Sequence, residues 1–151
     1  MRPRAALALL ALAGAGAALA LPGFRLTAIQ QFHYDQGNPL WEYDRKVMSC
    51  AYCHVKESGG APWNAFGQAL QQQFRADAAA VRKNKFPAVL YDRLKLMQDA
   101  DGDGYADALE VYARTLPGDP ASKPGKPVAE LEKAFTAAGG VAQYAPKVKK
   151  P

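Results

Sequence analysis

The sequence predicts an all-α protein, a small helical domain with long loops. Apolar residues recur at helical spacing in several separate segments. We find no convincing run with the alternating apolar pattern of a strand. Proline and glycine interrupt the helical pattern between the segments, most clearly in LPGDPASKPGKP, residues 116–127. These observations favour short helices with long irregular connections.

The first twenty residues predict a signal peptide. Arg2 and Arg4 precede an uncharged run of mostly alanine and glycine, and Ala18-Leu19-Ala20 fits a small-x-small cleavage pattern. A membrane anchor is the alternative, but the run is at the lower length limit for a span and no stop-transfer group follows it. We expect residues 1–20 to be removed. Residues 21–151 would then reach the periplasm or another extracytoplasmic space without a stable membrane span.

The part of the chain expected to be exported is predicted to form one domain with a small positive net charge. Residues 21–151 are enough for one hydrophobic core but not comfortably for two. The formal net charge of +5 falls to +3 when Arg2 and Arg4 are removed, which gives no indication of a nucleic-acid partner. Lys147, Lys149 and Lys150 predict a flexible basic C-terminal tail. The oligomeric state is not indicated.

Two short helices are expected before the cysteines. Their ranges are Leu26 to Phe32 and Leu40 to Val47, joined by the turn-like Gln36-Gly37-Asn38-Pro39. After the cysteines, Phe66, Leu70 and Phe74 recur every fourth residue and predict one apolar helical face.

The only two cysteines form the motif Cys50-Ala51-Tyr52-Cys53-His54. The spacing C-x-x-C-H is typical of covalent c-type haem attachment. In that chemistry two thiols become thioethers on the porphyrin edge, and the next imidazole binds the iron. We therefore predict one covalent haem c per chain, with Cys50 and Cys53 as tethers and His54 as the proximal ligand.

The cysteine pair has three alternative uses. An exported protein often joins two cysteines in a disulfide, and C-x-x-C also occurs in redox-active thiol pairs. A thioredoxin-like pair needs a βαβ pattern, which we do not find. A structural zinc site needs four ligands, and His33 is the only other histidine.

The second informative stretch is the acidic segment DADGDGYADALE, residues 99–110. It matches the EF-hand loop pattern, with oxygen ligands at positions 1, 3, 5, 9 and 12 and a glycine at position 6. An acidic surface turn is the alternative, but five carboxylates this close repel one another without a cation. We predict a structural Ca²⁺ site formed by Asp99, Asp101, Asp103, the carbonyl group of Tyr105, Asp107 and Glu110.

The flanking segments predict an EF-hand-like helix–loop–helix. Val89, Leu90, Leu94 and Met97 have helical spacing before the loop, and the helical pattern resumes from Asp107 to Leu116 after it. A last short helix is expected around Val128, Leu131 and Phe135, ending at Gly139-Gly140.

The haem motif behind a signal peptide resembles bacterial cytochromes c. The continuation Gly59 to Leu70, the acidic loop and LPGDPASKP together resemble a poorly characterised group of small exported mono-haem proteins. The resemblance covers Met48 to Pro124. It does not cover the segment before Met48. Classical small cytochromes c place glycine and an aromatic residue where this chain has Glu42 and Lys46, which argues against the standard cytochrome c fold but not against haem attachment.

The sixth iron ligand decides the function, and three possibilities remain open. Met97 lies 43 residues after His54, a separation that resembles short bacterial cytochromes. Methionine with histidine suits electron transfer, although most helical methionines are core residues. His33 and an open position are the alternatives, whereas Met48 is too close to Cys50 in sequence to cross the ring without strain. Met97 is the provisional choice.

We therefore predict an exported mono-haem c-type cytochrome that carries single electrons between redox protein partners and is not an enzyme. A di-haem peroxidase would need a second C-x-x-C-H, which the chain lacks. One alternative is a haem-based sensor or small-gas binder with an open sixth position. The other is a calcium-stabilised haem subunit of a larger redox complex.

Overall fold

The computed structural model describes residues 22–79 and 85–147. The predicted signal peptide, Lys149 and Lys150 lie outside the described residues. Within the described ranges there are helices but no strand, which confirms the all-α prediction. No helix in these ranges is long and apolar enough to cross a membrane. The helices are α1 (Pro22–Gln31), α2 (Pro39–Tyr43), η1 (Cys50–Tyr52), α3 (Ala65–Ala79), α4 (Phe86–Lys95), α5 (Asp107–Ala113), α6 (Val128–Ala137) and η2 (Gly140–Tyr144).

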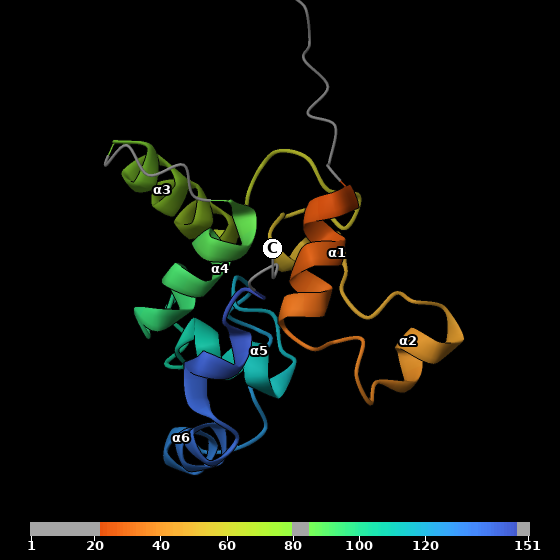
Figure 1. Ribbon diagram of the computed structural model, residues 1–151, viewed down its shortest axis with the longest axis vertical. Coiled ribbons are helices and arrows are strands. Elements are labelled where there is room, and N and C mark those ends of the chain that lie inside the picture. The colour runs from red at the N-terminus through yellow and green to blue at the C-terminus, as the bar shows by residue number, and fades with distance from the viewer. Residues whose placement is uncertain (1–21, 80–84, 148–151) are drawn as a thin grey trace, which may run out of the picture.

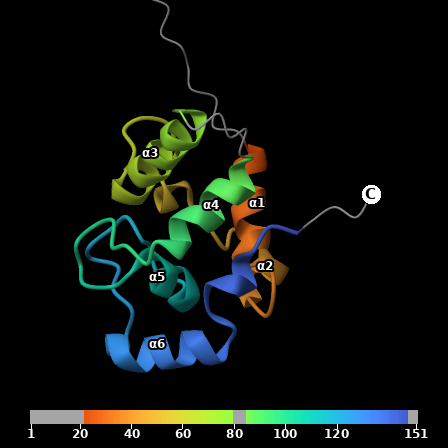
Figure 2. The same ribbon diagram turned by 60° about the vertical axis from the view of Figure 1, so that its left-hand side comes forward.

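Helix α4 is the central element of the fold. It contacts α1, α3, α5 and the C-terminal turn η2. Figures 1 and 2 show α1 and α3 towards one end of the molecule and α6 at the other end, beyond α5. Pro87 stands in the first turn of α4, where a missing N–H costs nothing. Val89, Leu90 and Leu94 form its buried face, each at most 1% exposed.

Three helices end earlier than the sequence pattern predicts, each for a local reason. Helix α2 ends at Tyr43 because Asp44 and Arg45 both donate to the carbonyl group of Leu40, and Arg45 is left-handed at φ 58°. Helix α4 ends at Lys95, and Met97 is left-handed at φ 48°. Helix α5 ends at Ala113, before the left-handed cap Arg114 at φ 63°. The apolar spacing from which we predicted these helices does not reveal where a non-glycine residue adopts a left-handed conformation.

Aromatic rings fill the centre of the core. Tyr52 packs edge-on against both Tyr34 and Phe66, and Phe32 packs edge-on against Tyr144. These contacts join the cysteine motif, helix α3, the segment after α1 and the C-terminal turn. The motif is therefore held by residues from distant parts of the chain.

Candidate cofactor cavity and candidate metal loop

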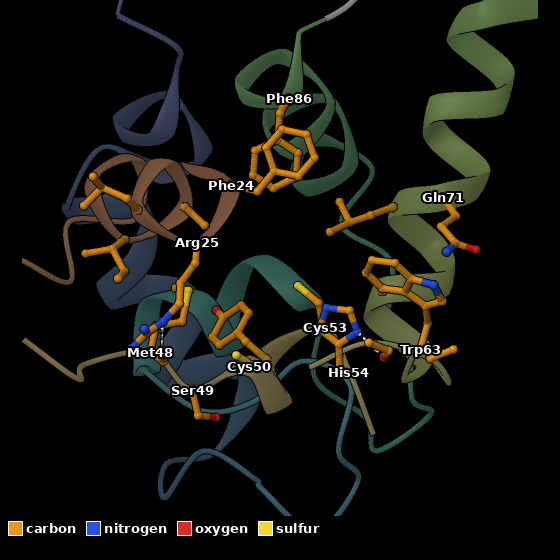
Figure 3. Close-up of a pocket in the computed structure, with 18 of the residues that line it drawn as sticks. Phe24, Arg25, Met48, Ser49, Cys50, Cys53, His54, Trp63, Gln71 and Phe86 are labelled. Atoms are coloured by element: carbon orange, nitrogen blue, oxygen red, sulfur yellow. Dashed lines mark hydrogen bonds between the residues drawn. The ribbon is translucent and has the colours of Figure 1, made fainter. Parts of the chain in front are cut away.

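An apolar cavity of about 790 Å³ lies beside the cysteine motif. Its walls come from α1, α3, the turn η1 and the start of α4 (Figure 3). Four of the aromatic and aliphatic side chains that line it are Phe24, Leu70, Phe74 and Phe86. The volume falls within the roughly 300–1,000 Å³ typical of cofactor and small-molecule sites.

The turn η1 presents Cys50, Cys53 and His54 to this one cavity. The N–H groups of Cys53 and His54 both donate to the carbonyl group of Cys50, at 3.2 and 3.0 Å. The two thiols are free and form no disulfide. The structure therefore brings together the three residues that the motif predicts to act together.

Burial controls the chemistry of Cys53. Desolvation, followed by the nearby Cys50, raises the pKa of the Cys53 thiol to about 12. The attacking group of a redox-active pair is a thiolate with a lowered pKa. Cys53 is therefore held as a neutral thiol and is not itself such an attacking group.

His54 is oriented by a main-chain acceptor. Its Nδ1 lies 2.6 Å from the carbonyl oxygen of Gly60. A carbonyl oxygen only accepts, so Nδ1 carries the proton, and in the neutral imidazole Nε2 keeps its lone pair for a metal. Gly59 and Gly60, at φ 79° and 78°, form the turn that returns this carbonyl group to the ring. Metal-binding histidines are typically oriented in this way by a second hydrogen bond.

Trp63 completes the surroundings of the imidazole. The two ring centroids lie 4.1 Å apart, and His54 and Trp63 form an isolated antiparallel bridge. Figure 3 shows this pair at one end of the cavity and Met48 at the other, with Cys50 between them.

Asn64 holds the motif in place from outside the cavity, a role that we did not predict from the sequence. Its Nδ2 donates to the carbonyl group of Ala51 at 2.7 Å, and its Oδ1 accepts from the N–H group of Gly67 at 2.9 Å. A Cβ atom at Gly67 would lie 2.1 Å from the carbonyl oxygen of Cys53. Only glycine permits helix α3 to approach the motif so closely. The Asn-x-x-Gly spacing was the available signal.

The predicted sixth ligand does not lie at the cavity. Met97 follows the end of α4 and is 42% exposed, and it is not among the residues that line the cavity. His33 is also absent from the lining and packs against the ring of Tyr144, with centroids 5.7 Å apart. Met48 does line the cavity and is only 4% exposed. The structure therefore brings neither Met97 nor His33 to His54.

The acidic loop gathers three carboxylates between α4 and α5. Oxygen atoms of Asp99, Asp101 and Asp103 lie within 4.8 Å of one another. The Asp99 carboxylate accepts from the N–H groups of Gly102 and Gly104, at 2.7 and 2.8 Å. Both glycines are left-handed, so the loop curls around its own first residue.

Glu110 is the carboxylate that most needs a cation. Its side chain is completely buried at the start of α5, and neither oxygen has a hydrogen-bond partner among the described residues. One oxygen each of Asp101 and Asp103 is likewise unpartnered. Burial, followed by repulsion from Asp101 and Asp103, raises the pKa of Glu110 to about 9. Glu110 is not among the carboxylates whose oxygens lie within 4.8 Å of one another, but a divalent cation bound nearby would offset this repulsion.

Asp107 has a different environment from the other loop carboxylates. Its Oδ2 lies 2.7 Å from a guanidinium nitrogen of Arg93, and its Oδ1 accepts from the N–H group of Ala100 at 2.8 Å. Burial raises the pKa of Asp107 to about 6, against the opposing effect of Arg93. Its oxygens are thus already partnered, and Asp107 joins the loop to α4. The hydroxyl group of Tyr105 donates to the carbonyl group of Lys126 at 2.9 Å, which joins the loop to the segment before α6.

No protein-family model matches the chain, and neither a curated protein nor a solved structure matches it significantly.

Proposed function

We propose that the protein is an exported mono-haem c-type cytochrome that transfers single electrons between larger redox proteins. The observation that carries this proposal is the orientation of His54. Its Nδ1 is occupied by Gly60, its Nε2 is free, and two free thiols share its apolar cavity. This combination fits covalent haem attachment better than a disulfide or a redox-active thiol pair.

The residues at the cavity fit a haem in three respects. Cys50 and Cys53 would hold the porphyrin edge, and the free Nε2 of His54 would hold the iron. The apolar walls exclude water from the ring, and burial of apolar surface contributes about 25 cal/mol per Å². Trp63 packs on the imidazole and restricts its rotation. When bound, the haem supplies a one-electron iron couple.

The acidic loop would hold one Ca²⁺ with a structural role. Asp99, Asp101, Asp103, Glu110 and the carbonyl group of Tyr105 would supply oxygen ligands. Asp107 would support the loop through Arg93 rather than meet the ion directly. Calcium accepts six to eight oxygens, so water completes the set.

Export and partners follow from the same proposal. Residues 1–20 would direct the chain to the periplasm or another extracytoplasmic space, where C-x-x-C-H proteins can meet electron donors and acceptors. We expect redox protein partners and no nucleic acid, since the mature charge is only mildly positive.

A second candidate function is a small-gas binder or sensor. The observation in its favour is that Met97 and His33 lie away from the cavity. An iron without a second protein ligand leaves one position open to a small neutral molecule. Binding of carbon monoxide to the reduced protein distinguishes the candidates: slow or weak binding supports the electron carrier, and rapid binding supports the gas binder.

The experiment that tests the proposed function is denaturation of the exported protein, followed by measurement of the haem that remains on the polypeptide. We expect one haem per chain to stay attached in the wild-type protein. The double variant Cys50→Ser/Cys53→Ser should lose it, whereas Met97→Leu, outside the cavity, should retain it. A wild-type chain without covalent haem would refute the proposal.

A further inference from the structure

Two arginines stand at the candidate haem cavity. Arg25 comes from α1, and Arg45 directly follows α2 and its cap. Among the described residues that line the cavity, they are the only lysine or arginine side chains, and there is no aspartate or glutamate. The cavity is therefore apolar with two positive charges.

Both guanidinium groups are held by neighbours that leave most of their donors free. Nε of Arg25 donates to the carbonyl oxygen of Met48 at 2.5 Å, so its terminal nitrogens remain available. The guanidinium of Arg45 lies over the ring of Trp41, 5.8 Å from its centroid. Figure 3 shows Arg25 reaching towards Met48, at the end of the cavity away from Trp63.

Neither arginine has a carboxylate partner in the part of the chain that the structure describes. The ion pairs found there involve Arg93, Lys95 and Lys126. Arg25 is half-buried against an apolar cavity, where an unpaired charge is unfavourable. Arg45 also lines the cavity but is exposed, so solvent reaches its charge. The pair is thus complementary to a ligand with an apolar body and two carboxylates at its edge.

We propose that Arg25 and Arg45 bind the two propionate groups of the haem. The inference rests on the proposed function, because haem is the apolar ligand with two carboxylates that the cysteine motif implies. Guanidinium groups match carboxylates in a bidentate geometry and stay charged at every accessible pH. The two arginines would therefore hold the propionates ionised and restrain the haem in addition to the links from Cys50 and Cys53.

The test is the reduction potential of the purified, haem-loaded protein over a pH series. The variants are Arg25→Gln and Arg45→Gln, and the control is Arg75→Gln, which removes one charge from α3 outside the cavity. Loss of the cation leaves the propionate charge unbalanced, which favours oxidised iron and lowers the potential. It also raises the propionate pKa, so the potential should fall with rising pH above the ordinary carboxyl range of ~4 to 5.

Equal potentials and equal pH dependence in the two cavity variants and in Arg75→Gln would overturn the inference. If the glutamine variants accumulate no haem-loaded protein, Arg25→Lys and Arg45→Lys decide, since they keep the charge. Haem loading with a near wild-type potential supports ion pairing. Loss of haem in the lysine variants as well indicates a packing role and overturns it. Absence of covalent haem from the wild-type protein would instead refute the proposed function.

Discussion

The hydroxyl groups of Tyr34 and Tyr52 lie 3.2 Å apart in the buried core, and Tyr34 also donates to the carbonyl group of Val111 at 3.1 Å. Tyr34 donates its one proton to Val111, so Tyr52 is the donor between the rings. Val111 follows Glu110 of the acidic loop, and Tyr52 stands between Cys50 and Cys53. One short chain of hydrogen bonds therefore joins the candidate metal loop to the candidate haem motif.

Removal of the Tyr34 hydroxyl group should uncouple the two sites. In the wild-type protein we expect a calcium chelator to change the haem absorption spectrum, because α5 relaxes and shifts Tyr52. The variant Tyr34→Phe should show a smaller change and lose about 1–3 kcal/mol of stability, since the buried hydroxyl group of Tyr52 loses its acceptor. Tyr112→Phe is the control, because its hydroxyl contact to Ala134 is long at 3.4 Å. An unchanged wild-type spectrum after chelation would contradict the coupling.

The calcium-free protein should lose stability as the pH rises. The pKa of Glu110 is about 9 in the folded chain and about 4.5 ordinarily, so the folded state binds more protons between these values. Its contribution is complete below the lower value and is lost progressively towards the higher one. Denaturant titrations across this range measure the slope. We expect Glu110→Gln or added calcium to flatten it, and a flat wild-type curve in chelator would contradict the prediction.

Glu110 and Asp107 should respond differently to loss of charge. Glu110→Gln removes an unpartnered carboxylate and should weaken calcium binding strongly while leaving the metal-free protein stable. Asp107→Asn leaves the buried guanidinium of Arg93 without its charged partner, since its other acceptor is the neutral amide of Gln98, and such a loss typically costs about 3–5 kcal/mol. Calorimetric calcium titration and thermal unfolding separate the two effects. The assignment fails if Asp107→Asn abolishes calcium binding without destabilising the calcium-free protein.

The close approach at Gly67 predicts a steric variant. In Gly67→Ala the new Cβ would collide with the carbonyl group of Cys53, so α3 and the cysteine motif must separate. We expect a loss of about 1–3 kcal/mol, as for other overpacked sites, and less covalent haem per chain. Gly125→Ala is the control, since a Cβ atom there would meet nothing within 4 Å. Equal haem content and melting temperature in both variants would refute this packing role.

Short sequence patterns predicted the helical fold class and the two candidate sites because each pattern lies within a few consecutive residues. The spacing of Cys50, Cys53 and His54 places them on one turn, and the acidic loop needs only twelve consecutive residues. Helix ends were less predictable, because the left-handed residues Arg45 and Met97 are not types that favour such turns.

Long-range assembly explains the features that the sequence did not reveal. The 43-residue separation of Met97 from His54 does not determine which way the chain runs after α4. The chain is left-handed at Met97, and this residue does not line the cavity. In the sequence, nothing distinguishes Arg25 and Arg45 from other charged residues. Only the fold places both beside a cavity whose described lining contains no aspartate or glutamate. Asn64 likewise gains its role only when α3 docks on the motif.

The hydrogen bond from His54 to Gly60 bears on how the orientation of the imidazole responds to pH. Many metal-binding histidines are oriented by a carboxylate, whose charge can be lost by protonation. Here the acceptor is a peptide carbonyl group, which does not ionise, and the glycine turn that presents it offers no side chain to replace. The orientation of the imidazole should therefore not depend on protonation of its acceptor, and adjustment of an iron held there would fall to other groups around the cavity.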